Sequence, residues 1–213
     1  SAIARADLVK LHVKIGETAP YAANRVVALV RKMFNLARTW GVFTGDNPAA
    51  GIELFKEEKR DRFVKPEELP ELFKAIQKET NPYRATAFLI LLLTGARKTE
   101  VITMRWEDMD MKQATWRIPE TKAGRPHLLP LPRANQKLLE KLPRQEGSAF
   151  VFPGRRKGKP MVKLSKSWKA IRTAAKLEDV RIHDLRRTLG SWLAAGGAGL
   201  PLIGKALNHS QVS

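Results

Sequence analysis

The stretch ATAFLILLLTGARKTEV spans residues 85–101 and decides the fold of this chain. Its first nine residues are apolar except for Thr86, so a helix built from them has no polar face. Such a helix is typical of a protein interior, whereas a membrane span needs about 20 apolar residues in succession. The stretch therefore predicts a central core helix, followed at once by Thr94-Gly95-Ala96 and a cation at Arg97.

Helical patterns precede and follow this core helix in the sequence. Residues 20–41 have an apolar stripe at helical spacing, with Pro20 suited to the first turn and Gly41 to the end. The stripe consists of Val26, Val30, Met33, Ala37 and Trp40. Another helix is expected from Pro66, where two acidic residues complement the helix dipole. Further helices are expected at about 133–142, 165–177, 184–195 and 200–208.

The pattern changes to alternation near the middle of the chain. Residues 115–118 (TWRI) and 127–131 (HLLPL) are two extended runs, and residues 121–125 between them supply turn formers. We expect a β-hairpin with Lys122 near its tip. The predicted fold class is mainly α (α+β), in which helices are joined by one small antiparallel sheet.

Residues 56–62 (KEEKRDR) are charged and lack a core-forming pattern. We interpret them as a linker between a small helical domain, residues 1–60, and a larger domain, residues 61–213. A solvated helix end is the alternative. The chain starts at Ser1 directly in a helical pattern, which suggests a fragment whose small domain begins upstream.

The charge balance indicates the kind of partner. The chain has 39 Lys and Arg against 21 Asp and Glu, a formal net charge of +18. This excess opposes compaction unless an anionic partner screens it, so nucleic acid or an anionic membrane is expected. No membrane-spanning run or secretory signal is visible, which favours nucleic acid. The absence of cysteine excludes disulfides, thiolate metal sites and cysteine nucleophiles, and it is compatible with a reducing cytoplasm.

Four candidate sites can carry chemistry: Arg97, Lys122, the His183/Arg186 pair, and His209. Taken singly, each is typical of an ordinary residue: a surface cation, a solvated lysine, a structural cap or a helix-end histidine. His183 and Arg186 are three residues apart, so they face the same way on a helix.

The sequence around these sites resembles the tyrosine recombinases, the lambda-integrase family. Residues 93–101 (LTGARKTEV) resemble the first arginine box, and residues 182–188 (IHDLRRT) look like the His-x-x-Arg box. Residues 207–210 (LNHS) look like the Leu-Gly-His-Ser box, with Asn208 in place of Gly. Asn tolerates a left-handed backbone, so we expect the turn there to persist. Residues 120–127 (ETKAGRPH) are similar to the hairpin that carries the family's catalytic lysine. The resemblance covers nearly all of 61–213, and residues 1–60 look like the core-binding domain.

This resemblance implies a site-specific recombinase that cleaves and religates double-stranded DNA through a 3′-phosphotyrosyl intermediate, in the integration or excision of a mobile element. The implied catalytic residues are Arg97, Lys122, His183, Arg186 and His209, with Glu100 as an orienting residue. No cofactor is implied. The working assembly would be a homo-tetramer on paired sites, in the cytoplasm of a bacterial or phage-infected cell.

The residue types agree with this chemistry. Two guanidiniums can hold the non-bridging oxygens of a phosphodiester as negative charge grows on them. His183 can add a hydrogen bond or accept the nucleophile's proton, and an ammonium at Lys122 can protonate the leaving 5′ oxygen. The sequence has no clustered carboxylates or histidines for a metal ion, which favours a metal-free reaction.

A tyrosine nucleophile is expected shortly after the third box, beyond Ser213. The tyrosines present are Tyr21 and Tyr83, which we interpret as packing residues. We therefore expect that the chain as given cannot cleave DNA.

Other basic residues are candidates for DNA contacts, and a solvated basic face is the alternative for each of them. They are Arg155, Arg156, Lys157 and Lys159 in a Gly-rich loop, and Lys163, Lys166, Lys169 and Arg172 along a helix. For the whole chain, the alternative to a recombinase is a non-catalytic DNA-binding module, either a truncated or a degenerate relative. A structural basic protein is a more distant alternative, since it would not need the four boxes.

Overall fold

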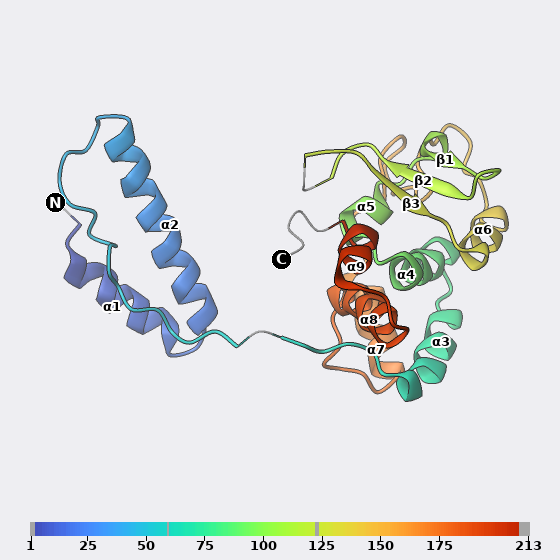
Figure 1. Ribbon diagram of the computed structural model, residues 1–213, viewed down its shortest axis with the longest axis horizontal. Helices are drawn as coiled ribbons and strands as arrows, with labels where there is room; N and C mark the ends of the chain where they lie inside the picture. Colours follow the sequence, from blue (N-terminus) through green and yellow to red (C-terminus); the bar gives the residue numbers. More distant parts are fainter. Residues whose placement is uncertain (1–2, 59, 122–123, 209–213) are drawn as a thin grey trace. The chain divides into compact units, whose positions relative to one another are not determined.

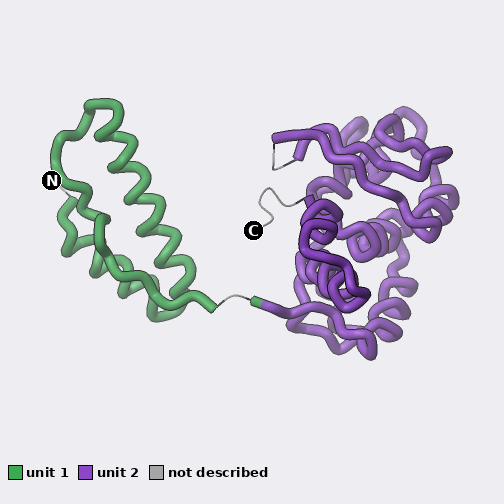
Figure 2. The backbone as a smooth tube through the Cα atoms, in the orientation of Figure 1, with its two compact units in different colours: residues 1–60 green, residues 61–213 purple. Residues whose placement is uncertain are grey.

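The computed structural model describes residues 3–58, 60–121 and 124–208. The chain divides into two compact units, Ser1–Arg60 and Asp61–Ser213, which Figure 2 shows in different colours. Each unit is described by itself.

The first unit consists of α1 (Arg5–Gly16), α2 (Pro20–Thr39) and a segment that returns along them. Its buried core is formed by Leu8, Val27, Ala49 and Ile52. Asn24 of α2 is 1% exposed and pins the returning segment, because its side chain donates to the carbonyl of Phe55 at 2.8 Å and accepts from the Phe55 amide at 2.9 Å. A fully hydrogen-bonded buried amide of this kind fixes the path of the chain after α2.

The apolar stripe that the sequence predicts for α2 is partly wrong. The buried face of the helix consists of Ala23, Asn24 and Val27, whereas Met33 is 58% and Trp40 69% exposed. The reason is one of length: α2 has 20 residues and α1 has 12, so the later turns of α2 extend past the packing that α1 provides.

The second unit is built around α4 (Pro82–Thr94), as Figure 1 shows. Phe88, Ile90 and Leu92 of α4 are completely buried, which confirms the predicted core helix. The surrounding helices are α3 (Leu69–Gln77), α5 (Lys98–Ile102), α6 (Arg133–Glu140), α7 (Ser165–Ala174), α8 (Ile182–Ala195) and α9 (Leu200–Ala206). The helix expected from Pro66 begins as a 3₁₀ turn, Pro66–Glu68, before α3.

The hairpin is present as part of a three-stranded antiparallel sheet. Its strands are β1 (Met109–Asp110), β2 (Thr115–Ile118) and β3 (His127–Pro130), in the order β1-β2-β3. Trp116 pairs with Leu129, and both are buried on the same face of the sheet. Helices joined by one small sheet confirm the predicted fold class, although the two-residue strand β1 was not expected.

The segment that enters the second unit is fastened to α8. Residues 56–58 and 60–62 lie in neither helix nor strand. Arg62 forms ion pairs with Glu68 at 2.7 Å and with Asp179 at 2.6 Å. The amide of Val64 then donates to the hydroxyl of Thr188, on α8, at 2.8 Å. These contacts hold the start of the unit against the helix that carries His183 and Arg186.

A candidate phosphate-binding site

The site begins at the corner between α4 and α5. Gly95 ends α4 with a φ of 63°, a left-handed backbone that glycine adopts without strain. A Cβ at this position would lie 2.7 Å from Leu207 Cδ2 and 2.9 Å from Leu189 Cδ2. The corner therefore packs closely on the segment after α9, and the chain turns to place Arg97 at the N-cap of α5.

Glu100 fixes Arg97 with both carboxylate oxygens. One oxygen accepts from Arg97 Nη1 at 2.8 Å, and the other accepts from the Arg97 amide at 2.7 Å. Glu100 is 8% exposed, so this charged hydrogen-bonded pair lies largely out of water. The guanidinium of Arg97 is thereby held in one orientation, with Nη2 donating to the carbonyl of Asn208 at 3.2 Å.

Arg186 joins three distant parts of the chain. It lies on α8, and its Nη1 donates to the carbonyl of Gly95 at 2.6 Å. Its Nη2 donates to the carbonyl of Leu207, next to the Asn208 carbonyl that Arg97 reaches. Asn208 has a φ of 48°, which confirms the turn expected there. The two guanidiniums therefore converge on the end of α9, and the first arginine box, the His-x-x-Arg box and the start of the third box meet at one place.

The electrostatics of this place favour an anion. Arg186 is 6% exposed, and its burial, together with the neighbouring Arg97, lowers its pKa to about 10. The side chain is still a cation at pH 7. Its hydrogen bonds to the two carbonyls use two of the five N–H donors that a guanidinium has. Two cations held side by side, one of them desolvated, are stabilised by an anion that accepts from both.

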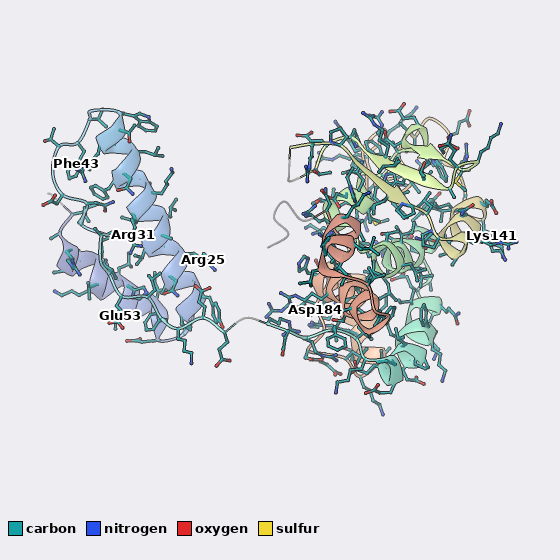
Figure 3. The ribbon with its side chains drawn as sticks, viewed as in Figure 1. Arg25, Arg31, Phe43, Glu53, Lys141 and Asp184 are labelled. Carbon is teal, nitrogen blue, oxygen red and sulfur yellow. The ribbon has the colours of Figure 1, made fainter. Side chains whose placement is uncertain are left out.

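His183 follows the N-cap of α8 by two residues, one turn before Arg186. The neighbouring residue on α8 is Asp184, which Figure 3 labels and which is buried. Its carboxylate accepts from the Arg181 amide and from Arg187 Nη1, each at 2.8 Å. Partial burial lowers the pKa of His183, and the cations Arg187 and Arg186 lower it further. His183 is therefore neutral at pH 7 and can accept a proton.

Two of the predicted catalytic residues, Lys122 and His209, lie outside the described residues. The basic residues of the Gly-rich loop, Arg155, Arg156, Lys157 and Lys159, are all exposed. Lys166 and Lys169 are exposed on α7, and Lys169 lines the same pocket as His183 and Arg186.

His127 is a residue near the site that the sequence reasoning did not single out. It begins β3, and its ring lies close enough to Arg186, Arg97 and Glu100 to be influenced by their charges. Burial is the main cause of its lowered pKa, and a hydrogen bond with the backbone of Ala206 partly opposes this effect. The position of His127 five residues after Lys122 was the available signal, since both belong to one hairpin.

No group of three or more His, Cys, Asp or Glu side chains that could hold a metal ion occurs in the part of the chain that the structure describes. Within the same residues, no helix has the length and apolar character needed to cross a membrane.

The family model of the phage integrase family matches residues 62–213. The chain belongs to this family, which confirms the resemblance to tyrosine recombinases. Among curated proteins, it is 30% identical over 201 residues to the prophage integrase IntZ of Escherichia coli strain K12, covering 92% of this chain and 50% of that protein. A shufflon-specific DNA recombinase of Escherichia coli is 29% identical over 176 residues, covering 78% and 43%. The chain thus spans about half the length of the curated relatives it matches.

Two solved structures of the same fold are DNA complexes. A Tn1549 transposon integrase in complex with a circular intermediate DNA superposes with a TM-score of 0.78 at 16% identity, covering 99% of this chain and 79% of that one. A lambda integrase dimer bound to a core site has a TM-score of 0.76 at 16% identity, covering 100% and 81%. At this identity the likeness concerns the fold.

Proposed function

We propose that this chain is the DNA-binding and phosphate-activating part of a site-specific DNA recombinase. The observation that carries the proposal is the convergence of Arg97 and Arg186, whose Nη2 atoms donate to the consecutive carbonyls of Asn208 and Leu207. Residues 1–60 act as the core-binding domain and residues 61–213 as the catalytic domain. The substrate is double-stranded DNA, and the full protein works as a homo-tetramer on paired sites in the cytoplasm.

In the proposed reaction a tyrosine hydroxyl attacks the scissile phosphorus, a bond from phosphorus to the tyrosine oxygen forms, and the bond to the 5′ oxygen breaks. The guanidiniums of Arg97 and Arg186 stabilise the charge on the non-bridging oxygens, and Glu100 keeps Arg97 in place. His183, neutral at pH 7, hydrogen-bonds the phosphate or accepts the tyrosine proton. Lys122 gives a proton to the leaving 5′ oxygen, and His209 adds a hydrogen bond to the phosphate. Religation reverses these steps, so no cofactor is consumed.

The alternative is that this chain is a DNA-binding module without cleavage activity. The surroundings of its two tyrosines, Tyr83 and Tyr21, favour this alternative. The hydroxyl of Tyr83 donates to the carbonyl of Pro143 at 3.0 Å. Tyr83 lies at the start of α4, and Arg97 follows the end of that 13-residue helix, about 20 Å away. The hydroxyl of Tyr21 exchanges hydrogen bonds with the backbone of Glu58 in the first unit. We therefore assign the nucleophile to neither of these hydroxyls.

A nicked suicide substrate tests both statements. The core site is first selected from a pool of random duplexes bound by the chain, and the nicked site is then incubated with protein and run on a denaturing gel. We expect salt-sensitive binding without a covalent adduct from residues 1–213, and an adduct when the chain is extended by its native tail. Arg186→Ala in the extended protein should abolish the adduct. A covalent band from residues 1–213, or an adduct yield unchanged by Arg186→Ala, would contradict the assignment.

A further inference from the structure

The second unit has a pocket of about 460 Å³ next to the two converging guanidiniums, and Arg186 but not Arg97 lines it. Six basic side chains line it: Lys98 of α5, Lys169 and Arg172 of α7, and Arg181, His183 and Arg186 around the start of α8. No aspartate or glutamate is among its lining residues. The volume is within the range of ligand-binding pockets, which is about 300–1,000 Å³, and the lining selects for an anion.

Most of the cations of this pocket have no carboxylate partner in the part of the chain that the structure describes. Among the described residues, Lys98, Lys169, Arg172 and Arg181 form no side-chain ion pair. The hydrogen bond of Arg172 Nη1 to the Val180 carbonyl is long, at 3.4 Å, and its Nε is buried without a partner in the described structure. The guanidinium of Arg172 therefore has N–H donors that no protein acceptor satisfies well within the described structure.

The pocket has a firm wall, so it is a formed site and not a loose patch of surface charge. Trp168 lines it, is 4% exposed, and its Nε1 donates to the carbonyl of Val180 at 3.0 Å. Its ring also packs on Phe88 of α4, with centroids 5.3 Å apart. Since Trp168 fixes α7 both to the core helix and to the segment before α8, Lys169 and Arg172 are presented from a fixed backbone.

The pocket adjoins the place proposed for the scissile phosphate without coinciding with it. His183 and Arg186 belong to both, but Arg97, Glu100 and Asn208, which complete the arginine pair, do not line the pocket. Phosphates of one DNA strand succeed each other every ~3.4 Å along the duplex axis. Because His183 and Arg186 belong to both places, a group bound in the pocket lies next to a phosphate held by the arginine pair.

We propose that this pocket is a second phosphate subsite, which receives a backbone phosphate flanking the scissile one. Its ligands are Lys169 and Arg172 of α7, together with Lys98 and Arg181. The location beside the scissile phosphate rests on the proposed function, whereas the anionic character of the ligand rests on the pocket itself. Occupation of two adjacent subsites fixes the direction of the strand across Arg186, which a single phosphate contact cannot do.

The test measures duplex binding by fluorescence anisotropy at several salt concentrations. Lys169→Gln, which removes an exposed charge, and the double change Lys169→Gln/Arg172→Gln are compared with Lys137→Gln/Lys141→Gln. The control removes two exposed lysines outside the pocket, Lys137 of α6 and Lys141 directly after this helix, which Figure 3 labels. We expect the pocket double variant to lose affinity by at least about tenfold, and the slope of log K against log salt to fall by about 1 per cation removed. The α6 variant should change little.

A second readout follows the Arg172 Nε–H signal in ¹H–¹⁵N spectra during titration with inorganic phosphate and with duplex. A saturable shift with both, weakened by Lys169→Gln, supports the subsite. The subsite is overturned if the parent binds duplex, its Arg172 signal does not move, and the pocket and α6 variants lose affinity equally. That result leaves the proposed function intact. A chain that binds phosphate but no duplex at low salt overturns both the subsite and the proposed function.

Discussion

Arg186 and Gly95 are 91 residues apart in sequence and are joined by a 2.6 Å hydrogen bond from Nη1 of the arginine to the carbonyl of the glycine. The bond fixes α8 to the corner that ends the core helix α4. Because Arg97 follows this corner by two residues, the same bond sets the spacing of the two guanidiniums. Gly95 thus matters for the site twice, through its carbonyl and through the space that its missing side chain leaves for Leu207.

Gly95→Ala should therefore lower the stability of the second unit by more than the backbone strain alone. The left-handed φ costs about 1–2 kcal/mol for a residue with a Cβ, and crowding against Leu207 and Leu189 adds about 1–3 kcal/mol. Gly158→Ala is the matched control, because Gly158 has a similar φ of 69° with nothing within 4 Å of its added Cβ. Urea unfolding measures both, and equal losses would show that the close approach to Leu207 has no energetic weight.

Glu100→Gln should allow the guanidinium of Arg97 to leave the orientation in which the Glu100 carboxylate holds it. Glutamine keeps the size of the side chain but has one acceptor oxygen, so it cannot hold both Arg97 Nη1 and the Arg97 amide. We expect duplex affinity within about threefold of the parent, because the change removes a negative charge, and a loss of cleavage of at least tenfold in a chain that carries the nucleophile. The control is Glu107→Gln, since the Arg105–Glu107 pair is exposed and contributes little. Cleavage unchanged by Glu100→Gln would remove Glu100 from the positioning role.

Local patterns account for the parts of the fold that the sequence predicts. The apolar run of α4 and the alternation of β2 and β3 depend on neighbouring residues, and both elements are found where they were expected. The five residues of α5 and the two of β1 are too short for a periodicity to be detected. The exposure of Met33 and Trp40 shows a further limit of sequence-based prediction. An apolar stripe identifies one face of a helix, but it does not indicate how far along that face a neighbouring helix packs.

The candidate site, too, could be predicted from the sequence only in part. Motif spacing identified Arg97, His183 and Arg186, yet it gave no indication that Arg186 donates to the carbonyls of Gly95 and Leu207. Such contacts depend on long-range packing and not on side-chain identity at the acceptor. For the same reason the pocket residues Lys98 and Arg181 were not singled out, since their shared surface exists only after α5, α7 and α8 are packed together.

Thr188→Val should loosen the attachment of the entering segment to α8. The Thr188 hydroxyl is fully buried, accepts from the Val64 amide at 2.8 Å and donates to the carbonyl of Asp184 at 2.8 Å. Valine has nearly the same shape, so the change leaves the buried Val64 amide without an acceptor, at a cost of about 1–3 kcal/mol. Thr173→Val on the exposed face of α7 is the control. Urea unfolding and amide exchange at Val64 measure the effect, and a Val64 amide that remains as protected as in the parent would contradict it.

Duplex binding should strengthen as the pH falls, through protonation of His183. In the free protein, partial burial and the neighbouring cations keep the His183 pKa below its usual value, so the ring is neutral at pH 7. A phosphate beside the ring stabilises the imidazolium, which raises the pKa in the complex. Binding then takes up a proton, and by linkage the affinity increases as the pH falls from about 8 towards 5. The increase ends once the pH is below the His183 pKa of the free protein, because His183 is then protonated in both the free and the bound state.

NMR titration of the His183 ring with and without duplex measures the two pKa values, and anisotropy measures the affinity. In His183→Gln the affinity should depend less on pH, and a pH dependence as steep as that of the parent would show that another group takes up the proton.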